Sequence, residues 1–106
     1  MLKLLLTCVI LVQLCPAALA DDLAESRRLY ALGEAASGYC PGMTTEWDRM
    51  EALGYRVDGE AEYRLYRSEY DAWMDWLRGH ESREAACDAV FRDYGAGTAA
   101  DLFIRP

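Results

Sequence analysis

The apolar positions along the chain recur with a helical period, in segments that glycines separate. No stretch shows the sustained alternation of a strand, so the pattern predicts an all-α fold. The longest segment, residues 60–78, places apolar side chains at the three- and four-residue spacing of one helix face. These side chains are Tyr63, Tyr66, Tyr70, Trp73, Met74 and Leu77. Leu65 and Trp76 lie off this stripe.

The first predicted helix begins at Asp21 or Asp22, whose carboxylates can accept hydrogen bonds from free backbone N–H groups. It ends near Ser37 or extends to Cys40, because Pro41 cannot continue a helix. Its expected buried stripe consists of Leu29, Leu32 and Ala36.

A short second helix is predicted after Thr44 or Thr45, either of which can cap its start. Trp47 and Met50 have the spacing of one helix face. Gly54 is the expected left-handed terminator of this helix.

Two further helices are predicted near the C-terminus. Ser82 is the expected cap of the fourth, whose buried face carries Cys87, Val90, Phe91 and Tyr94. Thr98 and Asp101 have the spacing of a capping box and predict a fifth, short helix that carries Leu102, Phe103 and Ile104. The expected architecture is a single domain over residues 21–106, a compact bundle of four or five short helices. Short glycine turns favour antiparallel neighbours in such a bundle.

The first 20 residues have the pattern of a secretory signal peptide. A positive start at Lys3 precedes an apolar run, and Ala18-Leu19-Ala20 fits the small-x-small rule for cleavage after Ala20. A membrane anchor is the competing interpretation, but the apolar run is shorter than the roughly 20 residues that a spanning helix needs. A lipoprotein processed at Cys15 is a second alternative. The chain is therefore expected in the periplasm or outside the cell.

Cleavage after Ala20 would leave two cysteines, Cys40 and Cys87, in an oxidising compartment. A disulfide between them is the expected outcome. A pair of free redox thiols is the alternative, although the chain has no Cys-x-x-Cys. Two cysteines and the distant His80 do not have the four-ligand spacing of a zinc site, and we expect neither a metal nor a cofactor.

The formal net charge is −7, and loss of the first 20 residues, with the only Lys, leaves 10 Arg against 18 acidic residues. Such a surface repels phosphate, which argues against nucleic-acid binding and against stable association with an anionic membrane. His80 is expected in a loop, and Asp71 and Asp75 share a helix face. A glycosidase would need two carboxyls across a cleft, for which a chain of this size has little room. We predict no catalytic residues and no enzymatic activity.

The distinctive feature is the run of five aromatic residues in the third helix, which are Tyr63, Tyr66, Tyr70, Trp73 and Trp76. One interpretation places most of them in the core of a small bundle. The other is an exposed patch in which Trp76, with Tyr63 or Leu65, meets a partner, since Tyr and Trp are enriched at interfaces. The acidic charge would steer a basic protein partner to it. An immunity or inhibitor protein that blocks a basic toxin or hydrolase is one concrete version.

The Cys40-Pro41 pair, the second cysteine 47 positions later and the short helices between them resemble small secreted bacterial proteins grouped in families of unknown function. The resemblance covers residues 29–104. The cysteine separation is also similar to that of periplasmic acid-stress chaperones, which are small helical proteins with one disulfide that bind unfolded clients at low pH. That resemblance implies carboxylates whose protonation loosens the packing and exposes apolar surface. Members of that chaperone family contain Lys, which this chain lacks after residue 20.

Overall fold

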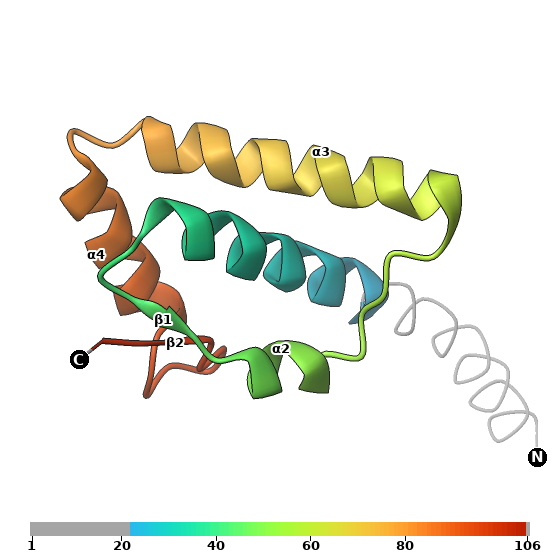
Figure 1. The fold of residues 1–106 in the computed structure, drawn as a ribbon, viewed down its shortest axis with the longest axis horizontal. Coiled ribbons are helices and arrows are strands. Elements are labelled where there is room, and N and C mark those ends of the chain that lie inside the picture. Colours follow the sequence, from blue (N-terminus) through green and yellow to red (C-terminus); the bar gives the residue numbers. More distant parts are fainter. Residues whose placement is uncertain (1–21, 106) are drawn as a thin grey trace, which may run out of the picture.

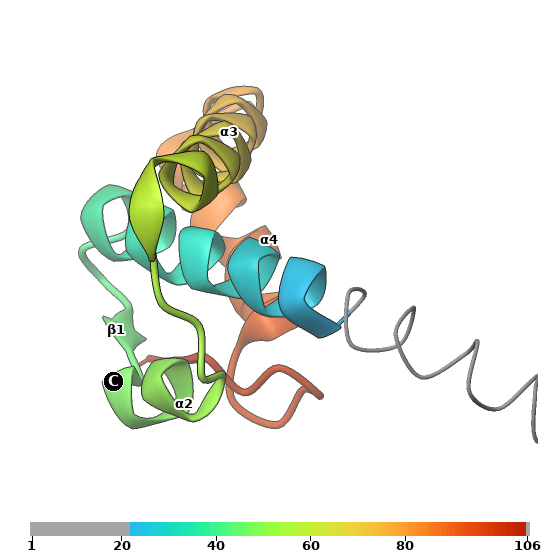
Figure 2. The ribbon, with the colours of Figure 1, turned by 90° about the vertical axis from the view of Figure 1, so that its right-hand side faces the viewer.

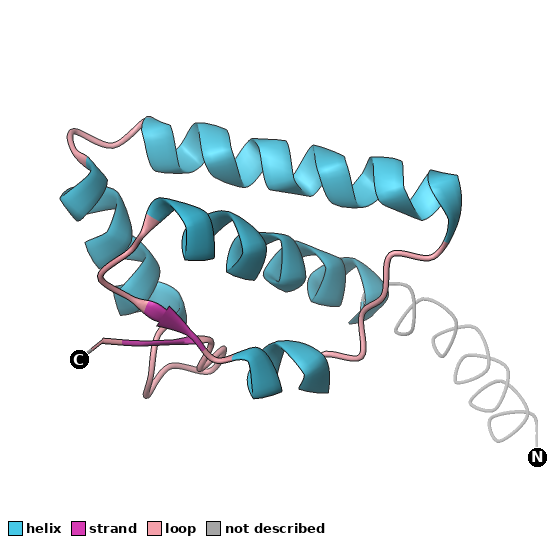
Figure 3. Ribbon diagram, in the orientation of Figure 1, coloured by secondary structure: helices cyan, strands magenta, loops and turns pink. Residues whose placement is uncertain are grey.

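The computed structural model describes residues 22–105, which form four helices and one short pair of strands (Figure 1, Figure 3). In chain order these are a first helix over residues 22–39, β1 (Thr44–Thr45), α2 (Trp47–Ala52), α3 (Gly59–Arg78), α4 (Arg83–Tyr94) and β2 (Phe103–Ile104). The predicted all-α fold is confirmed. The expected signal peptide, residues 1–20, and the expected cap at Asp21 lie outside the described residues.

The first helix and α3 lie side by side and run in the same direction (Figure 1, Figure 2). Arg27 Nε donates to Glu62 Oε1 at 2.7 Å, and about one turn further along both helices the rings of Tyr30 and Tyr66 are 6.0 Å apart. The expected antiparallel arrangement concerns helices joined by a short turn, and this pair is not joined in that way. Instead, β1, α2 and the loop after α2 carry the chain back to the end from which α3 starts.

The core lies where the first helix, α2, α3, α4 and the C-terminal segment meet. Its largest fully buried side chains are Leu32, Cys40, Met50, Leu77, Val90, Leu102 and Phe103. A disulfide joins Cys40 to Cys87 within this core, with the two Cα atoms 5.7 Å apart, and confirms the predicted pairing. It connects the residue after the first helix to α4.

The contact between α2 and the first helix depends on a glycine. A Cβ atom added to Gly33 would overlap the Sδ and Cε atoms of Met50. Glycine therefore lets the Met50 side chain approach the backbone of the first helix closely, and Met50 is only 1% exposed. The predicted left-handed turn at Gly54, with φ +69°, then ends this segment. These two glycines set the position of α2 against the first helix.

The predicted fifth helix does not form. Thr98 Oγ1 donates to the Gly95 carbonyl at 2.6 Å and accepts from the Asp101 N–H at 3.3 Å, so the expected capping residue closes a turn instead. Phe103 and Ile104 form β2, which pairs antiparallel with β1. A strand suits this segment because alternation buries Phe103 completely and leaves Ile104 at the surface.

The same pairing corrects the start of α2. Thr44 and Thr45 were expected to cap the helix, but they form β1, in register with Ile104 and Phe103. Glu46 precedes α2 without a capping side-chain hydrogen bond. At α4 the expected cap is confirmed, because Ser82 Oγ accepts from the Ala85 N–H at 3.0 Å.

Candidate functional site

The five aromatic residues of α3 divide into two groups. Tyr66, Tyr70 and Trp73 are half-buried, whereas Tyr63 is 50% and Trp76 is 37% exposed. Tyr70 and Trp73 pack against the core, and Tyr66 contacts other aromatic rings. The core interpretation therefore describes some of the five aromatic residues, and the exposed-patch interpretation describes the others. The structure does not gather the five side chains on one surface.

The half-buried tyrosines belong to a ring cluster that joins three elements. Tyr66 lies 6.0 Å from Tyr30 of the first helix, 6.5 Å from Tyr55 and 6.2 Å from Tyr70, between ring centres. Burial raises the pKa of Tyr66 to about 12, and burial together with the nearby Glu62 raises the pKa of Tyr55 to about 12. These phenols stay neutral at ordinary pH, and their contacts hold the first helix, α3 and the loop after α2 together.

The side chain of Trp73 contacts residues of the first helix and of α4. Its Nε1–H donates to the Arg28 carbonyl at 2.9 Å, and its ring lies 5.6 Å from that of Tyr94 in an edge-to-face arrangement. The Arg28 guanidinium lies 5.5 Å from the Trp73 ring centre. Hydrogen bonds to Glu25, and secondarily to Tyr94, raise the pKa of Arg28. Trp73 is thus a rigid support for its neighbour Trp76, whose ring lies 5.5 Å away.

Three exposed side chains and the half-buried Glu69 share one face of α3 and form a stripe along it. We call this stripe the α3 flank, and it consists of Leu65, Glu69, Ala72 and Trp76. Leu65 is 49% exposed and lies 11 positions before Trp76, about three helical turns. Tyr63 lies about 140° around the helix from Trp76, on a different side. Leu65, and not Tyr63, is therefore the residue that extends the Trp76 surface.

The chemistry of the α3 flank is apolar with one charge. A shallow pocket of about 240 Å³ lies at its C-terminal half, lined by Arg28, Glu69, Ala72, Trp73 and Trp76. Within residues 22–105 Glu69 forms no ion pair. His80 stacks edge-to-face on Trp76, with ring centres 4.6 Å apart, and its Nδ1 lies 2.8 Å from the Trp76 carbonyl. His80 therefore packs against Trp76 at the C-terminal end of α3.

A second surface, which the sequence pattern did not indicate, lies between α2 and the first helix. Trp47 and Met50 have the spacing of one helix face, but Met50 is 1% exposed and Trp47 is 51% exposed. Trp47 lines a cleft of about 460 Å³, the α2 cleft, with Tyr30, Met50, Glu51, Gly54, Tyr55 and Arg56. The reason is that Met50 alone fills the gap at Gly33, so Trp47, one turn earlier, remains outside. No signal in the sequence links Gly33 to Met50 before the fold is known.

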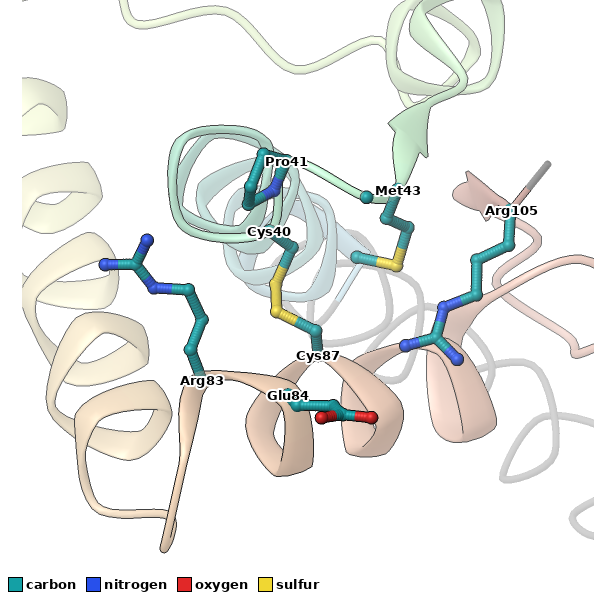
Figure 4. Close-up of a pocket in the computed structure, with 8 residues that line it drawn as sticks. Cys40, Pro41, Met43, Arg83, Glu84, Cys87 and Arg105 are labelled. Carbon is teal, nitrogen blue, oxygen red and sulfur yellow. A yellow bond between two sulfur atoms is a disulfide. The ribbon is translucent and has the colours of Figure 1, made fainter.

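A third pocket, of about 270 Å³, lies against the disulfide, and Figure 4 shows Arg83 and Arg105 on opposite sides of it. Arg83 lies 4.8 Å from the ring centre of Tyr39. Arg105 pairs with Asp88 and lies over Phe91. Both guanidinium groups therefore already have intramolecular contacts.

The other side chains with acid–base chemistry are dispersed. Asp71 pairs with Arg67 at 3.2 Å, one turn earlier on the same helix. In the described part of the chain, no group of three or more His, Cys, Asp and Glu side chains is placed to hold a metal ion. The α3 flank and the α2 cleft therefore suit binding through apolar contacts and electrostatic attraction.

The fold and these surfaces define a small all-α protein with one disulfide, an exposed apolar stripe on its longest helix and an aromatic cleft beside its shortest. Within residues 22–105 no helix is both long and apolar enough to cross a membrane. A scan against protein-family models finds no match, and searches of curated proteins and of solved structures find none either.

Proposed function

We propose that this chain is a secreted, non-enzymatic binding protein that recognises another protein through the α3 flank, in the manner of an immunity or inhibitor protein. The observation that carries the proposal is the exposure of Leu65 and Trp76 on one helix face. Trp residues supply a large share of the binding energy at protein interfaces, above all where neighbours hold them rigid. Trp73 and His80 hold Trp76 in this way.

The charge of the chain favours a basic partner. The net charge is −7, and Glu69 lies within the flank without an ion pair among the described residues. A Lys or Arg side chain of a partner could lie on the Trp76 ring and approach the Glu69 carboxylate. Long-range attraction between an acidic and a basic protein also accelerates their encounter.

The test is crosslinking in intact cells with a tagged chain, followed by mass spectrometry of the proteins recovered. The test variant combines Leu65→Ala with Trp76→Ala. The control is Tyr63→Ala, because Tyr63 is also an exposed aromatic residue of α3 but lies on another side of the helix. We expect one stoichiometric partner with wild type and with the control, and its loss with the double variant. Recovery of the same partner with all three chains would overturn the proposal.

An acid-stress chaperone is the second candidate, and the Arg27–Glu62 ion pair favours it. This pair ties the first helix to α3, with side chains only 13% and 18% exposed. The hydrogen bond from Arg27 lowers the pKa of Glu62, so the pair weakens at a lower pH than the ordinary pKa of a Glu side chain. A chaperone would bind more hydrophobic dye near pH 3 and protect unfolded clients there. A sample that neither loosens nor holds clients at that pH would eliminate this candidate.

A further inference from the structure

The α2 cleft brings three aromatic rings to one cavity. Trp47 comes from the first position of α2, Tyr30 from the first helix and Tyr55 from the loop after α2. The Tyr30 and Tyr55 ring centres are 5.3 Å apart with an angle of 51° between the ring planes. Tyr30 is half-buried, Tyr55 is 6% exposed and Trp47 is 51% exposed, so Trp47 offers the largest open ring surface. Met50 lies beside them, with its thioether held against Gly33. The volume of about 460 Å³ lies in the range of small-molecule sites.

Aromatic rings that line a cleft attract cations. The face of each ring carries a negative potential, and cavities lined by Trp and Tyr bind methylated ammonium groups, which fit an apolar wall and still carry charge. Glu51 lines the same cleft and forms no ion pair within residues 22–105, so its carboxylate is available to balance a cation.

Arg56 favours a ligand that also carries a negative charge. It lines the α2 cleft and, in the described part of the chain, pairs neither with Glu51 nor with another carboxylate. Two opposite charges therefore share one cleft without neutralising each other directly. A simple cation would be repelled by Arg56, whereas a molecule with both charges satisfies Glu51 and Arg56 together.

We propose that the α2 cleft binds a small zwitterion that carries a methylated ammonium group. The ammonium group lies against Trp47, Tyr30 and Tyr55 with Glu51 beside it, and the anionic group of the ligand pairs with Arg56. A free solute such as a betaine and the phosphocholine headgroup of a lipid share this chemistry. The site is separate from the α3 flank and does not depend on the function proposed above.

The test uses glycine betaine and its carbon isostere 3,3-dimethylbutanoate, which has the same shape and carboxylate but no ammonium charge. Binding to the full chain is followed by chemical-shift changes at the residues of the α2 cleft. We expect saturable binding of glycine betaine, and binding of the isostere weaker by about tenfold or more. Equal binding of the two compounds, or no saturable binding of glycine betaine, would overturn the proposal.

Variants locate the site. Trp47→Leu keeps an apolar side chain but removes the ring, and it should weaken glycine betaine binding by about tenfold. Trp76→Leu is the matched control, because Trp76 is also exposed but lies on the α3 flank. Arg56→Gln should weaken glycine betaine more than tetramethylammonium, which has no anionic group. Unchanged binding by Trp47→Leu, with thermal melting equal to wild type, would exclude the α2 cleft as the site.

Vesicles distinguish the two sources of the ligand. Co-sedimentation of the chain with phosphatidylcholine vesicles, but not with phosphatidylglycerol vesicles, would assign the lipid headgroup. Binding of free glycine betaine without co-sedimentation would assign a small solute. Either result supports the proposed chemistry and names its source.

Discussion

The Cys40–Cys87 disulfide is expected to supply a large part of the stability of this chain. The cysteines are 47 positions apart, so the bridge closes a loop of 48 residues. In the chain-entropy model, closing a loop of that length in the unfolded state stabilises the folded state by about 4 kcal/mol. The 86 residues that follow the expected cleavage site correspond to a total free energy of unfolding of about 4 to 13 kcal/mol. The bridge therefore accounts for about a third of that stability, or more.

The perturbation is the double substitution Cys40→Ala with Cys87→Ala. Because Cys40 is 1% and Cys87 is 8% exposed, the loss of two buried sulfur atoms adds a cavity cost to the loop entropy. Urea unfolding followed by circular dichroism measures the sum. With a slope of about 1 to 2 kcal/mol/M, the midpoint should fall by about 2 to 4 M.

A reducing agent provides the control. It should lower the midpoint of the wild-type chain by a similar amount and leave the double variant unchanged, because the variant has no bridge to lose. A double variant within about 1 kcal/mol of wild type would refute the reasoning, since the loop entropy alone requires about four times that loss.

Two further predictions concern the packing of the first helix. Gly33→Ala should destabilise the chain by about 1 to 3 kcal/mol in thermal melting, because the new methyl group overlaps Met50. Gly38→Ala on the same helix meets no atom within 4 Å and should be neutral or slightly stabilising, and equal melting of the two variants would contradict the packing argument. The Arg27–Glu62 pair should contribute about 1 kcal/mol or less. Because Arg27 lowers the pKa of Glu62, this contribution is complete above the ordinary pKa of 4.5 and is lost as the pH falls through the lower, folded value. The stability difference between wild type and Glu62→Gln should therefore shrink in acid, and a constant difference would exclude the pair as its cause.

The helices and the disulfide could be predicted because their signals are local. Helical periodicity, the Ser82 cap and the stop before Pro41 each depend on a few neighbouring residues. The position of α3 was predicted to within one residue, at Gly59–Arg78. The cysteine pairing needed no geometry, because only two cysteines follow the expected cleavage site.

The strand pair was missed because its signal is not local. Leu102 and Phe103 are apolar neighbours in a segment with a helix-like cap, and helix was the reasonable local prediction. Their structure is decided by partners far away in the chain: the Leu102 carbonyl accepts from the Glu46 N–H at 2.8 Å. Local propensity was overridden by backbone groups that needed hydrogen-bond partners. The α2 cleft escaped prediction for a related reason, since it depends on Met50 meeting Gly33 across two elements.

Trp47 and Trp76 are both exposed, either because each binds a partner or because the core has no room for them. The two residues allow two independent tests of these explanations. A small chain with many aromatic residues cannot bury all of them, so the exposure of Trp47 or Trp76 alone could reflect a core that is already full. That explanation predicts that replacing either ring changes neither stability nor binding. The proposals predict that Trp76 substitution affects only the protein partner and that Trp47 substitution affects only the zwitterion. Because the two rings lie on different surfaces, each variant is the control for the other, and a loss of both activities in one variant would indicate disturbed folding.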